Sequence, residues 1–167
     1  MNRDDVHAKL APAIEAQLND LAQANHCGAG SIVKGVNRAE LRTRLASVDR
    51  LACEVELVSV TEPKLSSLAT DRLQQIADHL AESLTYLEEQ LIVLEVDPLA
   101  SQVQMRSKTP RVEAEAKSYF ELHVGKLGVH LQRYRKEPSI RREQLAATFT
   151  RDVLTRLCVD IVSAVVT

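Results

Sequence analysis

The chain has 167 residues, of which 45% are hydrophobic and 26% charged, and its 21 Lys and Arg against 23 Asp and Glu give a formal net charge of −2. This length suits one domain with its own core, and the composition excludes a collagen-like or disordered chain. No apolar run approaches the ~20 residues of a transmembrane helix, and only 3% of the residues are aromatic.

The first residues and the cysteines indicate an intracellular environment. Asp4 and Asp5 stand where a signal peptide would carry basic residues, and no apolar segment follows them. Cys27, Cys53 and Cys158 lie far apart and form no C-x-x-C pair. We therefore expect a cytoplasmic protein with reduced thiols and with no metal or other cofactor.

The N-terminal residues have the spacing of an amphipathic helix. Apolar side chains recur every three or four positions from Val6 to Leu21, which predicts a helix over about residues 4–26. Gly28 is expected to end this helix, because glycine adopts the backbone conformation that closes helices.

The residues that follow predict a linker and a second, short helix. Residues 28–36 hold three of the five glycines, so we expect a linker that leaves the helix of residues 1–27 peripheral to an α+β core at 52–167. Asn37 and Glu40 have the spacing of helix-capping residues. The short helix would then present Leu41, Leu45 and Val48.

The middle of the chain predicts a strand, a long helix and a hairpin. Apolar and acidic residues alternate from Cys53 to Val60, as in a half-buried strand. Leucines at helical spacing from Leu65 to Leu87 then predict a long amphipathic helix. Residues 91–96 and 102–108 flank a turn and predict a hairpin.

A second hairpin is predicted around the short turn between Gly125 and Gly128. Residues 117–124 and 129–135 form its strands, and symmetric closure pairs Val124 with Val129. The register collects five side chains on one polar face: Tyr119, Glu121, His123, His130 and Tyr134. Two opposed histidines beside a carboxylate could share a metal, but a solvated sheet face is the reading we favour.

The C-terminal part predicts a long helix that lies across the sheet. Pro138 and Ser139 introduce it, and a broad apolar stripe runs from Leu145 to Val165. The order of elements is then α-α-β-α-β-β-β-β-α. This order favours an α+β fold with a largely antiparallel sheet of about five strands packed against the last helix.

Positive charge is concentrated in residues 106–142, which hold ten basic against four acidic residues, a balance of +6. The last basic residues of this stretch would lie in the first turn of the predicted C-terminal helix, where free backbone N–H groups favour anions. One hypothesis is therefore a small-anion site. The alternative is a solvated loop, or pairing with acids such as Glu137. The five candidate residues are Arg133, Arg135, Lys136, Arg141 and Arg142.

Three functions compete. The first is a small non-enzymatic interaction domain that binds a protein partner or a second copy of itself as a homodimer, since no nucleophile elbow, zinc-protease or paired-carboxylate motif is present. The second is a small-anion binder that uses the basic hairpin. The third, a weak nucleic-acid binder, is disfavoured by the net charge and the few aromatic rings, and no membrane partner is expected.

Overall fold

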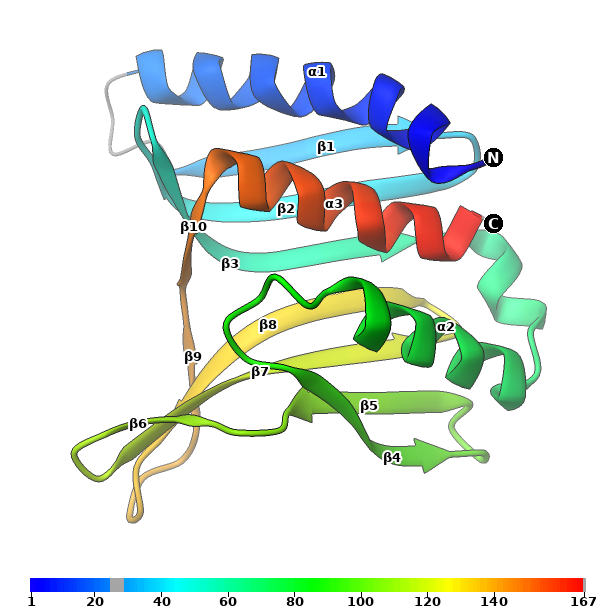
Figure 1. Ribbon diagram of the computed structural model, residues 1–167, viewed down its shortest axis with the longest axis vertical. Helices are drawn as coiled ribbons and strands as arrows, with labels where there is room; N and C mark the ends of the chain where they lie inside the picture. Colours follow the sequence, from blue (N-terminus) through cyan, green and yellow to red (C-terminus); the bar gives the residue numbers. More distant parts are fainter. Residues whose placement is uncertain (25–28, 167) are drawn as a thin grey trace.

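The computed structural model describes residues 1–24 and 29–166 (Figure 1). Within these residues three α-helices, one short 3-10 helix (η1) and ten strands follow one another. In chain order they are α1 (Arg3–Gln23), β1 (Gly30–Val36), β2 (Ala39–Val48), β3 (Ala52–Thr61), η1 (Pro63–Ser67), α2 (Thr70–Ser83), β4 (Leu91–Asp97), β5 (Gln102–Ser107), β6 (Arg111–Glu113), β7 (Ala116–Gly125), β8 (Gly128–Lys136), β9 (Glu143–Leu145), β10 (Ala147–Thr150) and α3 (Arg151–Val166).

The strands form one antiparallel sheet in the order β1-β2-β3-β8-β7-β5-β4. Three short strands pair with members of this sheet outside that order: β10 pairs with β3, β6 with β7 and β9 with β8. The α+β class and the antiparallel pairing are confirmed. The expected number of about five strands is wrong, because the described chain contains ten.

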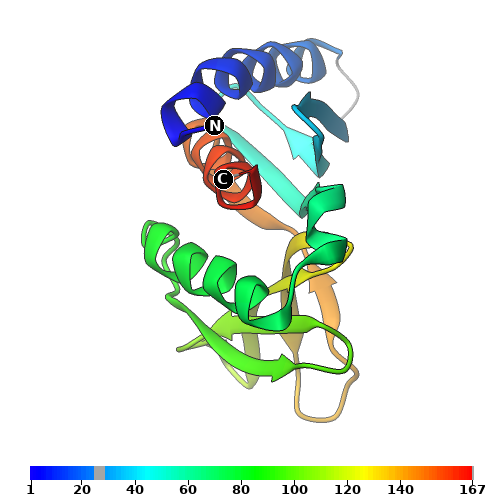
Figure 2. The same cartoon turned by 90° about the vertical axis from the view of Figure 1, so that its right-hand side faces the viewer.

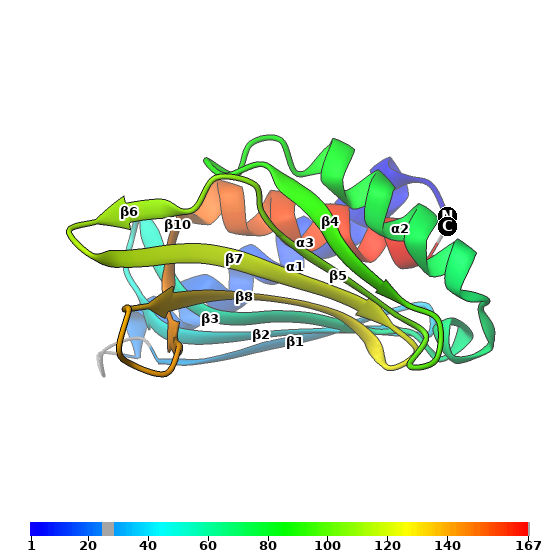
Figure 3. The same ribbon diagram turned by 90° about the horizontal axis from the view of Figure 1, so that it is seen from below.

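All three helices cover the same side of the sheet, here called the helix face, and leave the open face uncovered (Figures 2 and 3). The apolar stripe of α1 is fully buried, with Val6, Leu10, Ile14 and Leu18 at most 1% exposed. The helix is therefore part of the core, and the expectation that it lies at the periphery is wrong. A periodic run of branched apolar side chains this long is stable only when another element covers it.

The expected linker and second helix form the first hairpin instead. Seven of the nine expected linker residues make the edge strand β1, whose register with β2 is regular from Gly30–Leu45 to Val36–Ala39. Asn37 adopts a φ of 56° in the tight turn between them, a conformation that asparagine tolerates better than most residues. Buried positions alternate with charged ones along β2, which is the pattern of a strand and not of a helix.

The middle elements follow the predictions with one interruption. β3 and the β4–β5 hairpin are confirmed. The predicted long helix is divided, because Leu68 and Ala69 are extended and separate η1 from α2. Leu73, Ala77 and Leu80 form the buried stripe of α2, which packs against β4, β5 and β7.

The last helix begins at Arg151, about twelve residues later than predicted. Residues 143–145 and 147–150 are strands, and the hydroxyl of Thr150 accepts a hydrogen bond from the Val153 amide in the first turn of α3. The threonines and the aromatic ring in 148–150 favour extended backbone, which explains the late start.

Asp160 holds α3 to its neighbours from a position that is only 5% exposed. Its carboxylate accepts a hydrogen bond from Arg3 of α1 at 2.6 Å and one from the Tyr86 hydroxyl at 3.0 Å. Burial raises the pKa of Tyr86, and the neighbouring Asp160 charge raises it further. One buried acid thus joins α1, α3 and the segment after α2.

The sheet divides at one end. β3 and β8 pair through Val58–Leu131, Ser59–His130 and Val60–Val129, and beyond these pairs the two strands diverge. β9 pairs with β8 and β10 pairs with β3, so residues 143–150 cross the opening between the two strands (Figure 1).

Cys53 and Cys158 lie in the core. Burial raises the pKa of Cys53 to about 11 and that of Cys158 to about 12. The prediction that Cys27 ends the first helix, together with the expected cap at Gly28, falls outside the described residues.

Candidate functional site

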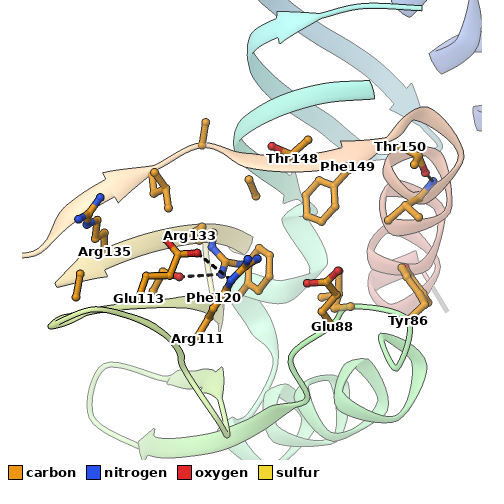
Figure 4. A pocket seen from close by; sticks show the side chains of 17 residues that line it. Tyr86, Glu88, Arg111, Glu113, Phe120, Arg133, Arg135, Thr148, Phe149 and Thr150 are labelled. Carbon is orange, nitrogen blue, oxygen red and sulfur yellow. Dashed lines mark hydrogen bonds and ion pairs between the residues drawn. The ribbon is translucent and has the colours of Figure 1, made fainter. Parts of the chain in front are cut away.

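A cavity of about 550 Å³ opens on the helix face at the end where the sheet divides (Figure 4). The inner sides of β6, β7, β8 and β9 form its floor, and β10, the first turn of α3 and the segment after α2 form its walls. This volume lies within the range of about 300–1,000 Å³ that is typical of small-molecule sites.

The strand register explains why the floor is hollow. Arg111, Ser118 and Arg135 are direct neighbours on β6, β7 and β8, and they form one row. Ala116 lies beside this row, opposite Glu113. The two small side chains leave space between the long arginine side chains on either side.

The next row, Phe120–Arg133–Leu145, begins the apolar part of the cavity. Phe120 stacks against Phe149 of β10, with ring centroids 6.0 Å apart. Both rings are buried. Tyr86 and Val153 line the cavity near α3.

Three arginines line the cavity, and their environments differ. The side chain of Arg133 is 13% exposed and donates to Glu89 at 2.6 Å and to the Ser118 hydroxyl at 3.0 Å. Arg111 pairs with Glu113 at 3.0 Å, and its side chain is 60% exposed.

Arg135 resembles Arg111, because it pairs with an exposed acid of its own segment. It lies 3.1 Å from Glu137, and the two side chains are 49% and 41% exposed. Exposed pairs of this kind contribute little, about 0–1 kcal/mol each, so the guanidinium groups of Arg111 and Arg135 remain available to another anion.

The structure separates the five basic residues expected to form one anion site. Arg133 and Arg135 lie in the cavity, whereas Lys136 points to the open face and Arg142 lies against that face. Arg141 is exposed in the loop between β8 and β9. Their expected meeting at a helix start is wrong, because α3 begins at Arg151 and strands precede it.

The register of the polar hairpin face is as predicted, but the expectation that this face is solvated is wrong, because Glu121 is only 2% exposed and the other four side chains are buried or partly buried. The observed register pairs Val124 with Val129 and Tyr119 with Tyr134, and it confirms each pair between these two. Tyr119 is only 3% exposed, because the Arg106 guanidinium lies 3.6 Å from its ring centroid. Its ring is therefore covered and does not form an exposed stacking platform.

Glu121 and His123 of this face contact protein partners. The carboxylate of Glu121 accepts two hydrogen bonds from Arg142 and lies 3.6 Å from His123. His123 also contacts Gln102 at 2.8 Å. Across the described residues, no group of three or more His, Cys, Asp or Glu is arranged to hold a metal ion.

His130 lies opposite His123 and is partly buried. Burial lowers the pKa of His130, and the nearby His123 lowers it further. This face therefore favours a neutral imidazole at position 130 near neutral pH.

Sequence reasoning missed Arg111, Glu88 and the walls of the cavity. In the sequence, Arg111 is distinguished only as one residue of the basic stretch 106–142, because β6 is three residues long and carries no strand pattern of its own. The alternation of β8 did place Arg133 and Arg135 on the apolar side, and this was the one available signal. Residues 86–88 and β10 line the same cavity although they lie far apart in the chain, so no local pattern reveals that they meet there.

No protein-family model, curated protein or solved structure matches the chain. Among the helices formed by residues 1–24 and 29–166, none has both the length and the apolar character needed to cross a membrane.

Proposed function

We propose that this chain is a non-enzymatic binding domain that holds a small anionic molecule in the cavity between the divided sheet and α3. The observation that carries the proposal is the placement of Arg111 and Arg135 on either side of Ser118, at the floor of a cavity of about 550 Å³. Guanidinium groups are the usual partners of carboxylates and phosphates, because their N–H groups match the geometry of these anions.

The cavity walls support a ligand with an apolar part. Phe120, Phe149 and Val153 border the cavity beyond the arginines. Burial of an apolar body there would stabilise the complex by about 25 cal/mol per Å² of apolar surface removed from water. The anionic group would stay at the more open end. A small carboxylate or phosphate ester with a hydrocarbon or aromatic body matches both parts.

Calorimetric titration of the full chain with hexanoate, phenylpropanoate and hexyl phosphate tests this proposal. We expect at least one probe to bind, and we expect the double substitution Arg111→Gln/Arg135→Gln to weaken binding about tenfold or more. Arg141→Gln is the matched control, because it removes an exposed arginine outside the cavity, and it should bind like the unchanged protein. No binding by any probe, or equal binding by the double variant, would overturn the proposal.

The edge strand β4 favours a second candidate function, protein binding or self-association by strand addition. β4 is paired on one side only, contains neither Lys nor Pro, and exposes Ile92 at 37% and Leu94 at 54%. The other edge strand, β1, contains Lys34, a residue typical of protected edges. Sedimentation at several salt concentrations tests the homodimer, with Leu94→Lys as the variant; a monomer under every condition would exclude it.

A further inference from the structure

Two carboxylates line the cavity, and only one of them has an internal partner. Glu113 pairs with Arg111 at 3.0 Å. Glu88 also lines the cavity, but no hydrogen bond or ion pair joins its carboxylate to another described residue. Glu88 is exposed to water, so its carboxylate can stay charged and can contact a ligand.

The charges are separated along the cavity. Figure 4 places Arg111 and Arg135 on one side of Phe120, and it places Glu88 on the other side, below Phe149. An apolar section therefore lies between a positive end and a negative end. This arrangement is electrically complementary to a molecule with opposite charges at its two ends.

We infer that the ligand of this cavity is dipolar, with an anionic group between Arg111 and Arg135, an apolar middle against Phe120 and Phe149, and a cationic group at Glu88. The inference rests on the proposed function, because it assumes that an anion binds at the arginines. A purely anionic amphiphile would use the arginine end and leave the Glu88 carboxylate facing an apolar tail.

Arg133 has a different part in this arrangement. Its guanidinium lies 4.6 Å from the ring centroid of Phe120 and is bound to the buried Glu89. Glu89 is 8% exposed, so separating the pair would leave a charge without solvent or partner. Arg133 is therefore a fixed part of the wall that positions Phe120, and the ligand meets the other two arginines.

Three probe series test the inference: straight-chain carboxylates, ω-amino carboxylates of the same lengths, and the corresponding alkylamines. We expect one chain length at which the ω-amino carboxylate binds about fivefold more tightly than the plain carboxylate, as an exposed ion pair of about 1 kcal/mol would give. Alkylamines alone should bind more weakly than either.

Variants separate the two ends of the site. Glu88→Gln should remove the advantage of the ω-amino carboxylates over the plain carboxylates, whereas Arg111→Gln/Arg135→Gln should weaken binding of both series. Glu115→Gln is the matched control, because Glu115 is an exposed acid in the turn between β6 and β7. The unchanged melting temperature of Glu88→Gln would show that the variant is folded.

The possible failures are distinguishable. If plain carboxylates bind but the ω-amino group adds nothing at any length, or if Glu88→Gln keeps the advantage, the dipolar ligand is wrong and the proposed function stands. If no carboxylate binds, the dipolar ligand is wrong, and if hexyl phosphate also fails to bind, the proposed function fails as well.

Discussion

Nη1 of Arg142 donates hydrogen bonds to both carboxylate oxygens of Glu121, at 2.7 and 2.8 Å, across the open face of the sheet. The carboxylate side chain is 2% exposed, whereas that of Arg142 is 45% exposed. The guanidinium also lies 4.4 Å from the ring centroid of Tyr134. This contact ties the start of β9 to the hairpin, although β9 lines the cavity on the opposite face.

Arg142→Gln is therefore expected to lower the free energy of unfolding by about 1–3 kcal/mol, because it leaves a buried carboxylate with a weaker partner. Urea denaturation measures this loss. The double variant Glu121→Gln/Arg142→Gln should recover part of it, since the unpaired charge is gone. A single variant as stable as the unchanged protein would show that the pair contributes nothing.

Asp160 supports a second prediction about stability. Asp160→Ala removes the acceptor of both Arg3 and the Tyr86 hydroxyl, and we expect the free energy of unfolding to fall by about 2–3 kcal/mol, because two hydrogen bonds to a charged group are lost. Tyr86→Phe deletes only one hydrogen bond and should cost about 1 kcal/mol. Equal losses in the two variants would contradict the central position of Asp160.

Gly128 supports a third prediction, with an internal control. Its φ is +144°, and a Cβ at this position would collide with the carbonyl oxygen of Val60. Gly128→Ala should therefore lower the free energy of unfolding by more than about 2 kcal/mol. Gly35→Ala is the control, because its Cβ would meet no atom within 4 Å, and its melting temperature should change little.

The pH dependence of stability follows from His130. Its pKa is lowered in the folded protein, so the unfolded chain binds a proton more readily. The folded state therefore has its full stability above the unfolded-state pKa of His130, about 6.5, and loses stability as the pH falls toward the folded-state pKa of His130. His130→Asn should make the free energy of unfolding less sensitive to pH between about 8 and 5. His79→Asn, on the exposed side of α2, should keep the original dependence.

The second hairpin was predictable because one local pattern determines it. Apolar residues alternate with polar ones on both sides of a short turn bounded by Gly125 and Gly128, and only one register places both apolar sets on the same face. The same logic failed for residues 28–48. Leu41 and Leu45 are spaced four apart, which suits a helix and a strand equally, and only the burial of Ala39 and Thr43 reveals the alternation.

The candidate site was predictable in part. The alternation along β8 places Arg133 and Arg135 on the side that faces the helices, and this placement is seen in the structure. Arg142 was expected beside them, but its position depends on the contact with Glu121, which lies 21 residues away. Contacts across such separations depend on the packing of the whole chain, and no local pattern in the sequence reveals them.

Only three residue pairs join β3 to β8, so the two sides of the sheet are connected by few contacts. A helix followed by antiparallel strands that pair in chain order occurs twice, as α1-β1-β2-β3 and as α2-β4-β5-β7, although the short strand β6 lies between β5 and β7 in the chain. Such local contacts form quickly, whereas α3 must pack on α1 and α2 together and cannot do so until both units exist. The slow step of folding is thus expected to be the closure of β10 and α3 over two units already assembled.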